Sequence, residues 1–297
     1  MILQDFCSLL QIVTGKQTSL SHVLSDEEWK NMYNLAKKQA LLGIAFEGVK
    51  KLPQGQWPTG DDVLNWTMTT EGIKRRNMRT TDVCLRLTKE LTKEGFDGCI
   101  LKGQANHVYY DRLSAEQSLG MLRVCGDVDA WIWPKEKTKH PVRTIIDYCK
   151  QKNILVSLCH LHAEVKPVGG VPVEIHFRPS FLNAPWRNRR FQKLFRTAKF
   201  ENVELDQCGT VKKLRVDYDL IFQMNHIYRH LLDEGVGMRQ VLDFYVLLKE
   251  YNKEQYERAG LMDRSEVMSH IQNCGMKRFA SALMFVLQDM FDMSDDE

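Results

Sequence analysis

The sequence predicts an α+β fold in which a small mixed sheet with helices is flanked by N- and C-terminal helical regions. Apolar side chains recur at helical spacing through residues 1–95. Residues 96–184 alternate strand-like and helical segments, and residues 185–297 return to mainly helical patterns. Strands that alternate with helices and then form a hairpin favour a sheet covered by helices. We expect three regions with these boundaries, and we expect the chemistry in the middle one.

The composition is typical of a globular protein. The chain has 297 residues, of which 43% are hydrophobic and 27% charged, so disordered and fibrous classes are excluded. The net charge of +3 is too small to indicate a general nucleic-acid or membrane-surface protein. No apolar run approaches the roughly 20 residues of a membrane-spanning helix. The first residues lack the features of a secretory signal, and we expect a cytoplasmic protein with no membrane partner.

The eight cysteines are scattered through the chain and include no C-x-x-C pair. In a cytoplasmic protein this spacing argues against a disulfide framework and against a structural zinc site. We expect most of the cysteines to be small buried hydrophobic residues.

The first region is expected to be helical. Ser25 and Glu28 have the spacing of a capping box, in which each side chain satisfies a backbone N–H at the start of a helix. We expect Gly43 to interrupt the helical pattern that follows. A long helix is predicted over residues 61–93, ending at Gly95. It carries a basic cluster made of Arg75, Arg76 and Arg79. We interpret the cluster as a solvated face, with a phosphate or nucleic-acid contact as the alternative.

The middle region is expected to contain the sheet. Alternating apolar and polar residues indicate strands, and turn-forming residues separate them. Glycine and proline in segment 166–170 are a strong hairpin signal. The predicted strands cover residues 96–101, 125–133, 154–165 and 171–177, with a helix over 141–152.

The last region is expected to add one more hairpin and then helices. Turn-forming residues separate two further strand-like runs, and helical periodicity begins shortly after them. The predicted hairpin joins residues 200–205 and 211–216, and the predicted helices cover residues 218–232, 238–251, 265–273 and 277–290.

Asp127 and Asp129 begin a strand-like run directly after Gly126. Residues two apart on a strand point to the same face, so both carboxylates project together. Two like charges about 6–7 Å apart are costly unless a cation lies between them, and Mg²⁺ suits carboxylate oxygens. A solvated strand end is the alternative. The same pattern at Asp217 and Asp219 starts a predicted helix, where Asp217 is better explained as an N-cap.

Glu174 is the third candidate carboxylate. It lies in a strand-like run whose apolar residues face one way, while Glu174, His176 and Arg178 face the other. Three acids on adjacent strands are the arrangement that two-metal phosphoryl transfer needs. Pairing of Glu174 with Arg178 or Arg123 is the alternative.

Lys102 and Gly103 follow a predicted strand and precede a predicted helix. The N–H groups at the start of a helix favour phosphate, and glycine lets a ligand approach closely. Gly126 allows the same close approach beside the acids. The Walker pattern is absent, so this is not a P-loop. Arg123 precedes the acids and either neutralises a phosphate or pairs with an acid.

The motif L-K-G at residues 101–103, the motif R-x-x-G-D-x-D at 123–129 and the later Glu174 together resemble the polymerase-β-type nucleotidyltransferase superfamily. Within it they are most similar to a poorly characterised branch that shares the L-K-G opening and the R-x-x-G-D-x-D core. The resemblance covers about residues 96–178. It implies that the two aspartates and Glu174 bind Mg²⁺, and that Gly103 and the helix after it hold a triphosphate. The superfamily usually has two small residues at this loop, whereas Gln104 follows Gly103 here.

The resulting hypothesis is a Mg²⁺-dependent nucleotidyltransferase that moves a nucleoside monophosphate from an NTP such as ATP to an acceptor hydroxyl. Asp127 and Asp129 would bind two ions, and Glu174 would hold one of them and orient or deprotonate the nucleophile. The acceptor stays open among small molecules, RNA and protein. The sequence indicates neither the base preference nor the oligomeric state.

Two alternatives come from other classes. One is a non-catalytic module that binds a nucleotide or a protein on the same fold. The other is a metal-dependent hydrolase, because His160, His162 and Glu164 alternate along one predicted strand and His176 lies across the hairpin.

Two further groups have weaker signals. Arg239 and Asp243 are four apart on a predicted helix, which favours a surface ion pair. A polar and aromatic cluster is a candidate contact for a nucleobase or an acceptor, and it consists of Asn225, His226, Tyr228, Arg229 and His230.

Overall fold

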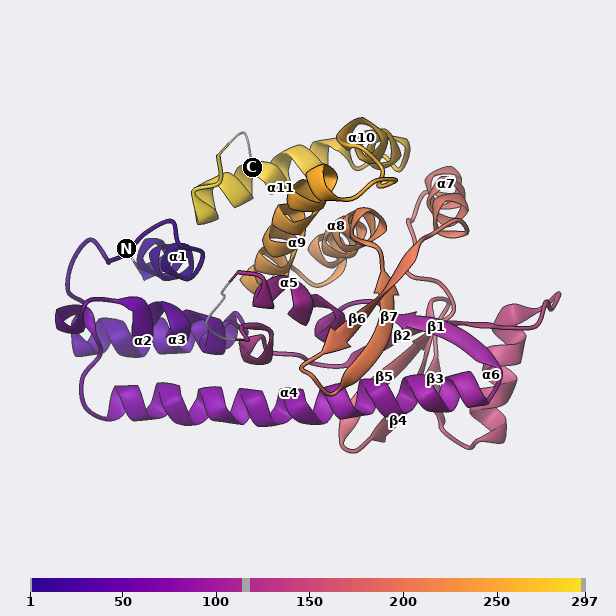
Figure 1. Cartoon of the computed structure of the whole chain (residues 1–297), viewed down its shortest axis with the longest axis horizontal. Coiled ribbons are helices and arrows are strands. Elements are labelled where there is room, and N and C mark those ends of the chain that lie inside the picture. The colour runs from indigo at the N-terminus through magenta and orange to yellow at the C-terminus, as the bar shows by residue number, and fades with distance from the viewer. Residues whose placement is uncertain (1, 114–117, 295–297) are drawn as a thin grey trace.

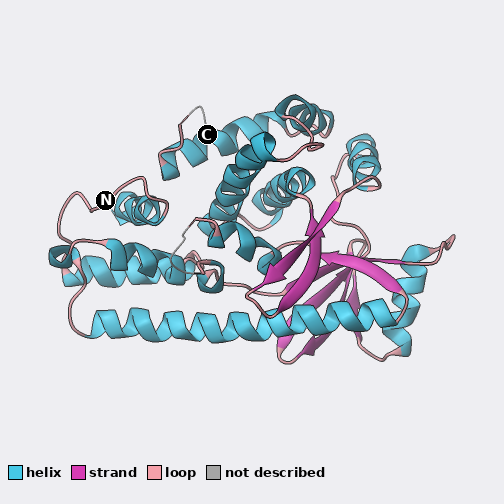
Figure 2. Cartoon of the chain, in the orientation of Figure 1, coloured by secondary structure: helices cyan, strands magenta, loops and turns pink. Residues whose placement is uncertain are grey.

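A mixed sheet with helices packed around it forms the centre of the computed structural model, which describes residues 2–113 and 118–294. Figures 1 and 2 show this arrangement, and it confirms the predicted α+β class. In the described part of the chain the sheet has seven strands in the order β3-β4-β5-β2-β1-β7-β6. The strands are β1 Phe96–Ile100, β2 Val128–Pro134, β3 Leu155–Leu158, β4 His162–Val168, β5 Val171–His176, β6 Phe200–Leu205 and β7 Gly209–Leu214.

The helices lie before, within and after the sheet sequence. Among the described residues, no helix combines the length and apolar character needed to cross a bilayer. The helices are α1 Ile2–Val13, α2 Asp26–Lys38, α3 Leu42–Lys51, α4 Asp61–Lys93, α5 His107–Asp111, α6 Pro141–Gln151, α7 Pro185–Phe195, α8 Val216–Asp233, α9 Met238–Glu257, α10 Arg264–Asn273 and α11 Lys277–Phe291.

The N-terminal helices begin as the sequence predicts. The backbone N–H of Glu28 donates to Ser25 Oγ, and Glu28 Oε2 accepts from the backbone N–H of Ser25, which confirms the capping box. The predicted interruption at Gly43 is wrong, because the chain turns at Ala40 with φ of 55° and Gly43 lies inside α3. The glycine is needed for packing instead: a Cβ there would lie 2.5 Å from the carbonyl oxygen of Leu122.

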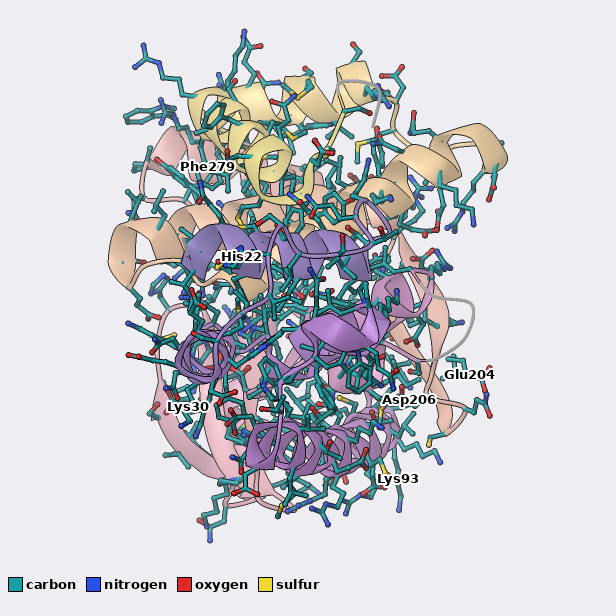
Figure 3. The ribbon with its side chains drawn as sticks, turned by 90° about the vertical axis from the view of Figure 1, so that its left-hand side faces the viewer. His22, Lys30, Lys93, Glu204, Asp206 and Phe279 are labelled. Carbon is teal, nitrogen blue, oxygen red and sulfur yellow. The ribbon has the colours of Figure 1, made fainter. Side chains whose placement is uncertain are left out.

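Helix α4 joins the N-terminal helices to the sheet. It covers the predicted 33 residues and spans about 50 Å along the bottom of Figure 1. Gly95 then turns the chain into β1 with φ of +88°. Figure 3 views this helix from its end, with Asp206 of the β6–β7 turn beside it. Asp206 accepts a hydrogen bond of 2.8 Å from Thr81 of α4, so the helix also holds this hairpin.

The middle region differs from the prediction at two places. The run predicted as one strand over residues 154–165 is two antiparallel strands, β3 and β4. The chain reverses between Cys159 and His162, where the backbone N–H of Cys159 donates to the carbonyl of His162. The predicted helix after Lys102 is a short 3₁₀ turn, Gly103–Asn106, followed by the single-turn helix α5.

The C-terminal region contributes to the same sheet. The predicted hairpin is confirmed as β6 and β7, and β7 pairs with β1 in parallel. The four predicted helices are confirmed as α8 to α11, whereas α7 was not predicted. As expected, most cysteines are buried: Cys84, Cys99, Cys125, Cys149 and Cys274.

The two faces of the sheet pack on different helices. Val128, Ala130 and Ile132 of β2 share a core with residues of α4 and α6. Trp131, which points to the other face, packs against the core formed with the N- and C-terminal helices. Because residues two apart on a strand share a face, Asp129 projects to the same side as Trp131.

Candidate active site

The three predicted carboxylates come together at the start of β2. Asp129 lies opposite Glu174 in the parallel register of β2 and β5, and Asp127 lies one residue before β2. One ligand oxygen of each acid lies within 4.8 Å of the others. The side chain of Asp129 is only 2% exposed, whereas those of Asp127 and Glu174 are 37% and 24% exposed. The group is therefore anchored in the sheet and open on one side.

Lys102 lies against this acidic group. Its Nζ atom is 2.9 Å from Asp129 Oδ2 and 3.8 Å from Asp127 Oδ1. Lys102 has an extended backbone and Gly103 follows with φ of +65°, a conformation that glycine adopts without strain. A Cβ on Gly103 would lie 3.5 Å from the carbonyl oxygen of Asp127. The predicted loop and the predicted acids are thus direct neighbours.

The charges of these groups affect one another strongly. Burial alone would raise the pKa of Asp129, but Lys102 and His176 hold it well below its usual range. The neighbouring charge of Asp129, followed by burial, raises the pKa of Asp127. Burial would lower the pKa of Lys102, but the two aspartates raise it. A charged ammonium therefore compensates carboxylates that would otherwise repel one another.

Two histidines complete the site. Nε2 of His176 is 3.0 Å from Asp129 Oδ1 and 3.1 Å from Glu174 Oε2. Nδ1 of His162, on the neighbouring β4, is 3.3 Å from Glu174 Oε2. His162, Glu174 and His176 form a second set of ligand atoms within 4.8 Å of one another. The ring of His160 instead packs on Phe181, with centroids 4.1 Å apart.

The histidine prediction is therefore only half right. His176 faces His162 across the hairpin as expected, but the tight turn separates His160 from His162. The sequence grouped His162 and His176 with His160 and Glu164 as candidate ligands, whereas the structure groups them with Glu174. The signal for this second set in the sequence is the alternation of Glu174 and His176 beside a histidine on the preceding strand.

Arg123 is part of the structural support rather than a free phosphate ligand. Its side chain is 4% exposed, and its Nε and Nη2 atoms each donate a hydrogen bond of 2.6 Å to Asp243. The expected surface pair of Arg239 with Asp243 is wrong, because Asp243 is buried and Arg123 takes both of its oxygens. Arg239 donates to the carbonyl of Val124 instead. Both arginines thus fix the segment that leads to the acids.

Gly126 and Arg76 meet at the edge of the site. A Cβ on Gly126 would meet no atom within 4 Å, so no neighbour within the described protein requires glycine there. Its carbonyl oxygen accepts a hydrogen bond of 3.3 Å from Nη2 of Arg76 on α4. One arginine of the basic cluster on α4 therefore reaches the loop that carries Asp127.

Helix α8 faces the site with two histidines of the predicted polar cluster. Burial, followed by the positive charge of Lys102, lowers the pKa of both His226 and His230. Their rings lie 4.3 Å apart. Asn225 is buried and donates to the sulfur of Met276. The guanidinium of Arg229 lies over the ring of Phe181, 4.0 Å from its centroid. Of the predicted cluster, His226 and His230 are therefore the residues whose pKa values respond to Lys102.

The second D-x-D pattern is structural. Asp217 and Asp219 have no exposed side-chain surface. Asp217 accepts two hydrogen bonds from Arg215, which is the N-cap of α8. The N-cap is therefore two residues before Asp217, whose carboxylate still accepts a hydrogen bond of 3.0 Å from the backbone N–H of Tyr218 in the first turn. Asp219 accepts a hydrogen bond from Tyr109.

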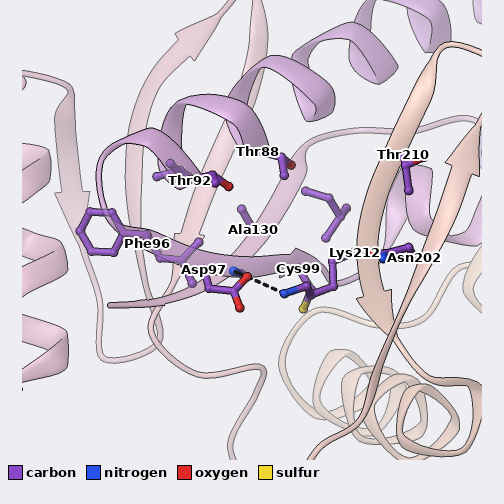
Figure 4. Close-up of a pocket in the computed structure, with 13 residues that line it drawn as sticks. Thr88, Thr92, Phe96, Asp97, Cys99, Ala130, Asn202, Thr210 and Lys212 are labelled. Atoms are coloured by element: carbon purple, nitrogen blue, oxygen red, sulfur yellow. Dashed lines mark hydrogen bonds and ion pairs between the residues drawn. The ribbon is translucent and has the colours of Figure 1, made fainter. Parts of the chain in front are cut away.

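A cavity of about 280 Å³ lies between α4, β1 and the β6–β7 hairpin (Figure 4). Its lining includes Ala130 and Ile132, which point away from the acids along β2. An ion pair of 2.6 Å joins Asp97 and Lys212 at its edge. The cavity is thus separate from the acidic group.

The sequence is similar to one known protein family. Residues 25–292 match the family described as "Uncharacterised nucleotidyltransferase". A search of solved structures matched the "crystal structure of an antigenic nucleotidyltransferase-like protein from Paracoccidioides brasiliensis", at 17% sequence identity and a TM-score of 0.38, covering 70% of this chain and 93% of that chain. A search of curated proteins gave no match.

Proposed function

The chain belongs to this family of uncharacterised nucleotidyltransferases, and from that membership we propose a Mg²⁺-dependent transfer of a nucleoside monophosphate from an NTP to an acceptor hydroxyl. The supporting observation is the convergence of one oxygen each from Asp127, Asp129 and Glu174 within 4.8 Å. The bond between the α- and β-phosphates breaks, a bond from the acceptor oxygen to the α-phosphorus forms, and pyrophosphate leaves.

The residues present fit divalent cations. The ligand atoms of this group are all carboxylate oxygens, which Mg²⁺ prefers, and two of the acids are open to incoming phosphates. The ammonium of Lys102 already lies where positive charge is favourable. When bound, Mg²⁺ would neutralise charge on the phosphates and on the attacking and leaving oxygens.

The protein groups have distinct proposed roles. Asp129 is fixed by the sheet and by its contact with His176, so it sets the position of the site. Asp127 is more exposed and faces the nucleotide. Glu174 orients the acceptor hydroxyl or accepts its proton, and His176 holds the carboxylate in place through Oε2.

Lys102 is proposed to change partners when substrate binds. Without substrate its ammonium balances the aspartates. With Mg²⁺ bound, the acids would no longer need the Lys102 ammonium, which would then be free to contact the triphosphate. The turn at Gly103 lets the backbone approach the same phosphates. Lys102 and the loop at Gly103 therefore both lie on the side of the acids where the triphosphate is proposed to bind.

The decisive test uses carboxylate-to-amide variants. We expect Asp127→Asn and Asp129→Asn to abolish pyrophosphate release and transfer of labelled NMP, since an amide cannot supply the anionic oxygen. Asp147→Asn on α6 removes an exposed carboxylate and should keep full activity. Full activity in the double variant at positions 127 and 129 would end the proposal. Binding of Mg²⁺–NTP without turnover on any acceptor would favour a non-catalytic binding module.

A second candidate function has one specific observation in its favour. His162, Glu174 and His176 form a ligand set with two imidazoles and a carboxylate, which suits Zn²⁺ or Mn²⁺ in a metal-dependent hydrolase. Metal analysis of the purified protein distinguishes the two. Stoichiometric Zn²⁺ that is lost in His162→Ala, together with phosphoester hydrolysis, would favour the hydrolase.

A further inference from the structure

A groove begins beside the acids on the same face of the sheet. Trp131 follows Asp129 by two positions on β2, so their side chains point the same way about 6–7 Å apart. Trp131 lines a groove of about 690 Å³ that is also lined by Pro141 of α6 and by residues 189–196 at the C-terminal end of α7. Both helices lie at the right-hand end of Figure 1, on either side of β1 and β2. A molecule that extends from the acids along this face of β2 would reach Trp131 and the groove.

The floor of the groove is aromatic. Trp131 and Phe177 are half-buried and line it together with Phe195, which is only 3% exposed and so offers no free face for stacking. The same three residues line an adjoining hollow of about 380 Å³. Trp133 and Phe200 extend the floor there, with ring centroids 5.1 Å apart. Flat aromatic surfaces of this kind bind unpaired bases by stacking, whatever the base.

The rim of the groove is basic. Its lining contains no acidic residue. It does contain four exposed cations, which are Arg178, Arg189, Lys193 and Arg196. Among the described residues, none of the four forms an ion pair with a carboxylate. Residues 178–199 carry seven Lys and Arg and no Asp or Glu, although the whole chain has a net charge of only +3. Four of these seven cations line the groove.

The cations form a row rather than a single point. Arg189, Lys193 and Arg196 are spaced by four and three residues, so they share one face of α7 and span about 10 Å. A row of cations fits successive phosphates of a chain better than one phosphate group. Charge along the rim and stacking surfaces along the floor are the two components of single-stranded nucleic-acid binding.

We infer that this groove binds a single-stranded nucleic acid, whose terminal hydroxyl is the acceptor at the acids. The second half of this inference rests on the proposed function. The first half does not, because binding is measured without any turnover. An acidic protein segment would use the cations but not the aromatic floor. A duplex would bury its bases away from that floor.

Fluorescence anisotropy with labelled oligouridylate tests the binding. We expect binding that weakens steeply between about 50 mM and about 200 mM salt, as phosphate contacts require. Arg189→Gln combined with Lys193→Gln should weaken binding about tenfold and reduce the salt slope by about 1.4. Lys89→Gln combined with Lys93→Gln removes the same charge from exposed positions on α4 and should change neither.

Several results would overturn the inference. One is that oligouridylate does not bind at low salt. Another is that the α4 control variant loses as much affinity for oligouridylate as the α7 variant does. A third is that a matched duplex or polyglutamate binds as tightly as oligouridylate. The two halves are then separated with Asp127→Asn. Oligouridylate that binds this variant and is extended only by the wild-type protein supports both halves. Oligouridylate that binds but is never extended leaves the groove assigned and removes nucleic acid as the acceptor.

Discussion

Asp129 of β2 and Glu174 of β5 lie directly opposite each other in a parallel strand pair, and Nε2 of His176 contacts both carboxylates. These contacts set the positions of two acids by main-chain register rather than by a loop. The candidate site is therefore largely preformed, and only Asp127 and Lys102 lie on segments outside the strands.

The two aspartates should differ in their effect on stability. Asp129→Asn removes the buried partner of Lys102 and His176, and we expect a loss of about 1–3 kcal/mol in the free energy of unfolding. Asp127→Asn relieves repulsion with Asp129 and should leave stability unchanged or slightly higher. Urea unfolding of the metal-free proteins measures both. Equal destabilisation by the two variants would contradict the assignment of Asp129 as the anchored acid.

Lys102 should compete with metal ions for the acids. Lys102→Gln removes a cation 2.9 Å from Asp129, so affinity for Mn²⁺ in the absence of nucleotide should rise about tenfold. Transfer should fall, because the same side chain is proposed to hold the triphosphate. Calorimetry with Mn²⁺ measures the first effect, with Lys139→Gln as an exposed control. Weaker Mn²⁺ binding in Lys102→Gln would show that this lysine supports the ion site instead.

The buried pair of Arg123 and Asp243 should contribute strongly to stability. Asp243→Asn leaves a buried guanidinium without its partner, and we expect a loss of about 3–5 kcal/mol. Arg143→Gln, which removes an exposed ion pair on α6, should cost less than about 1 kcal/mol. Chemical denaturation of both variants gives the comparison, and similar losses would show that the buried pair contributes little.

The same pair predicts a direction of pH dependence. Burial alone would raise the pKa of Asp243, but Arg123 outweighs it and holds the pKa below its ordinary value. A carboxyl with a lowered pKa in the folded state stabilises the protein above its unfolded-state pKa of about 4, and this contribution is lost as pH falls further. The free energy of unfolding should therefore decline below about pH 4, less steeply in Asp243→Asn. An equal slope in the two proteins would contradict this.

Gly43 should be intolerant of a side chain. Gly43→Ala places a Cβ 2.5 Å from the carbonyl oxygen of Leu122, and overpacking of this kind costs about 1–3 kcal/mol. Gly72→Ala in α4 has no atom within 4 Å of its new Cβ and should stabilise the helix by up to about 1 kcal/mol. Thermal unfolding of the two variants should move in opposite directions, and a shift in the same direction would refute the packing explanation.

The acidic group could be predicted because it depends on local rules. Strand periodicity places Asp127 and Asp129 on one side, and Glu174 lies in a neighbouring strand-like run. The long helix α4 could equally be predicted from the sequence, because its periodicity and its ending at Gly95 are local signals.

The missed features depend on contacts distant in sequence or on weak turn signals. The partner of Arg123 lies 120 residues away in α9, and no spacing rule identifies it. The turn between β3 and β4 contains neither glycine nor proline, so the two strands appeared as one and His160 was grouped with His162. Helix α7 was missed because cations dominate its sequence and only Phe191, Leu194 and Phe195 are buried.

The most direct test of the central claim is anomalous diffraction from crystals grown with Mn²⁺ and a non-hydrolysable NTP. The account predicts manganese peaks coordinated by Asp127, Asp129 and Glu174, with the α-phosphate beside them and the Lys102 ammonium moved onto the triphosphate. Manganese held by His162 and His176 with the aspartates uncoordinated, or nucleotide bound with no manganese at these acids, would contradict it.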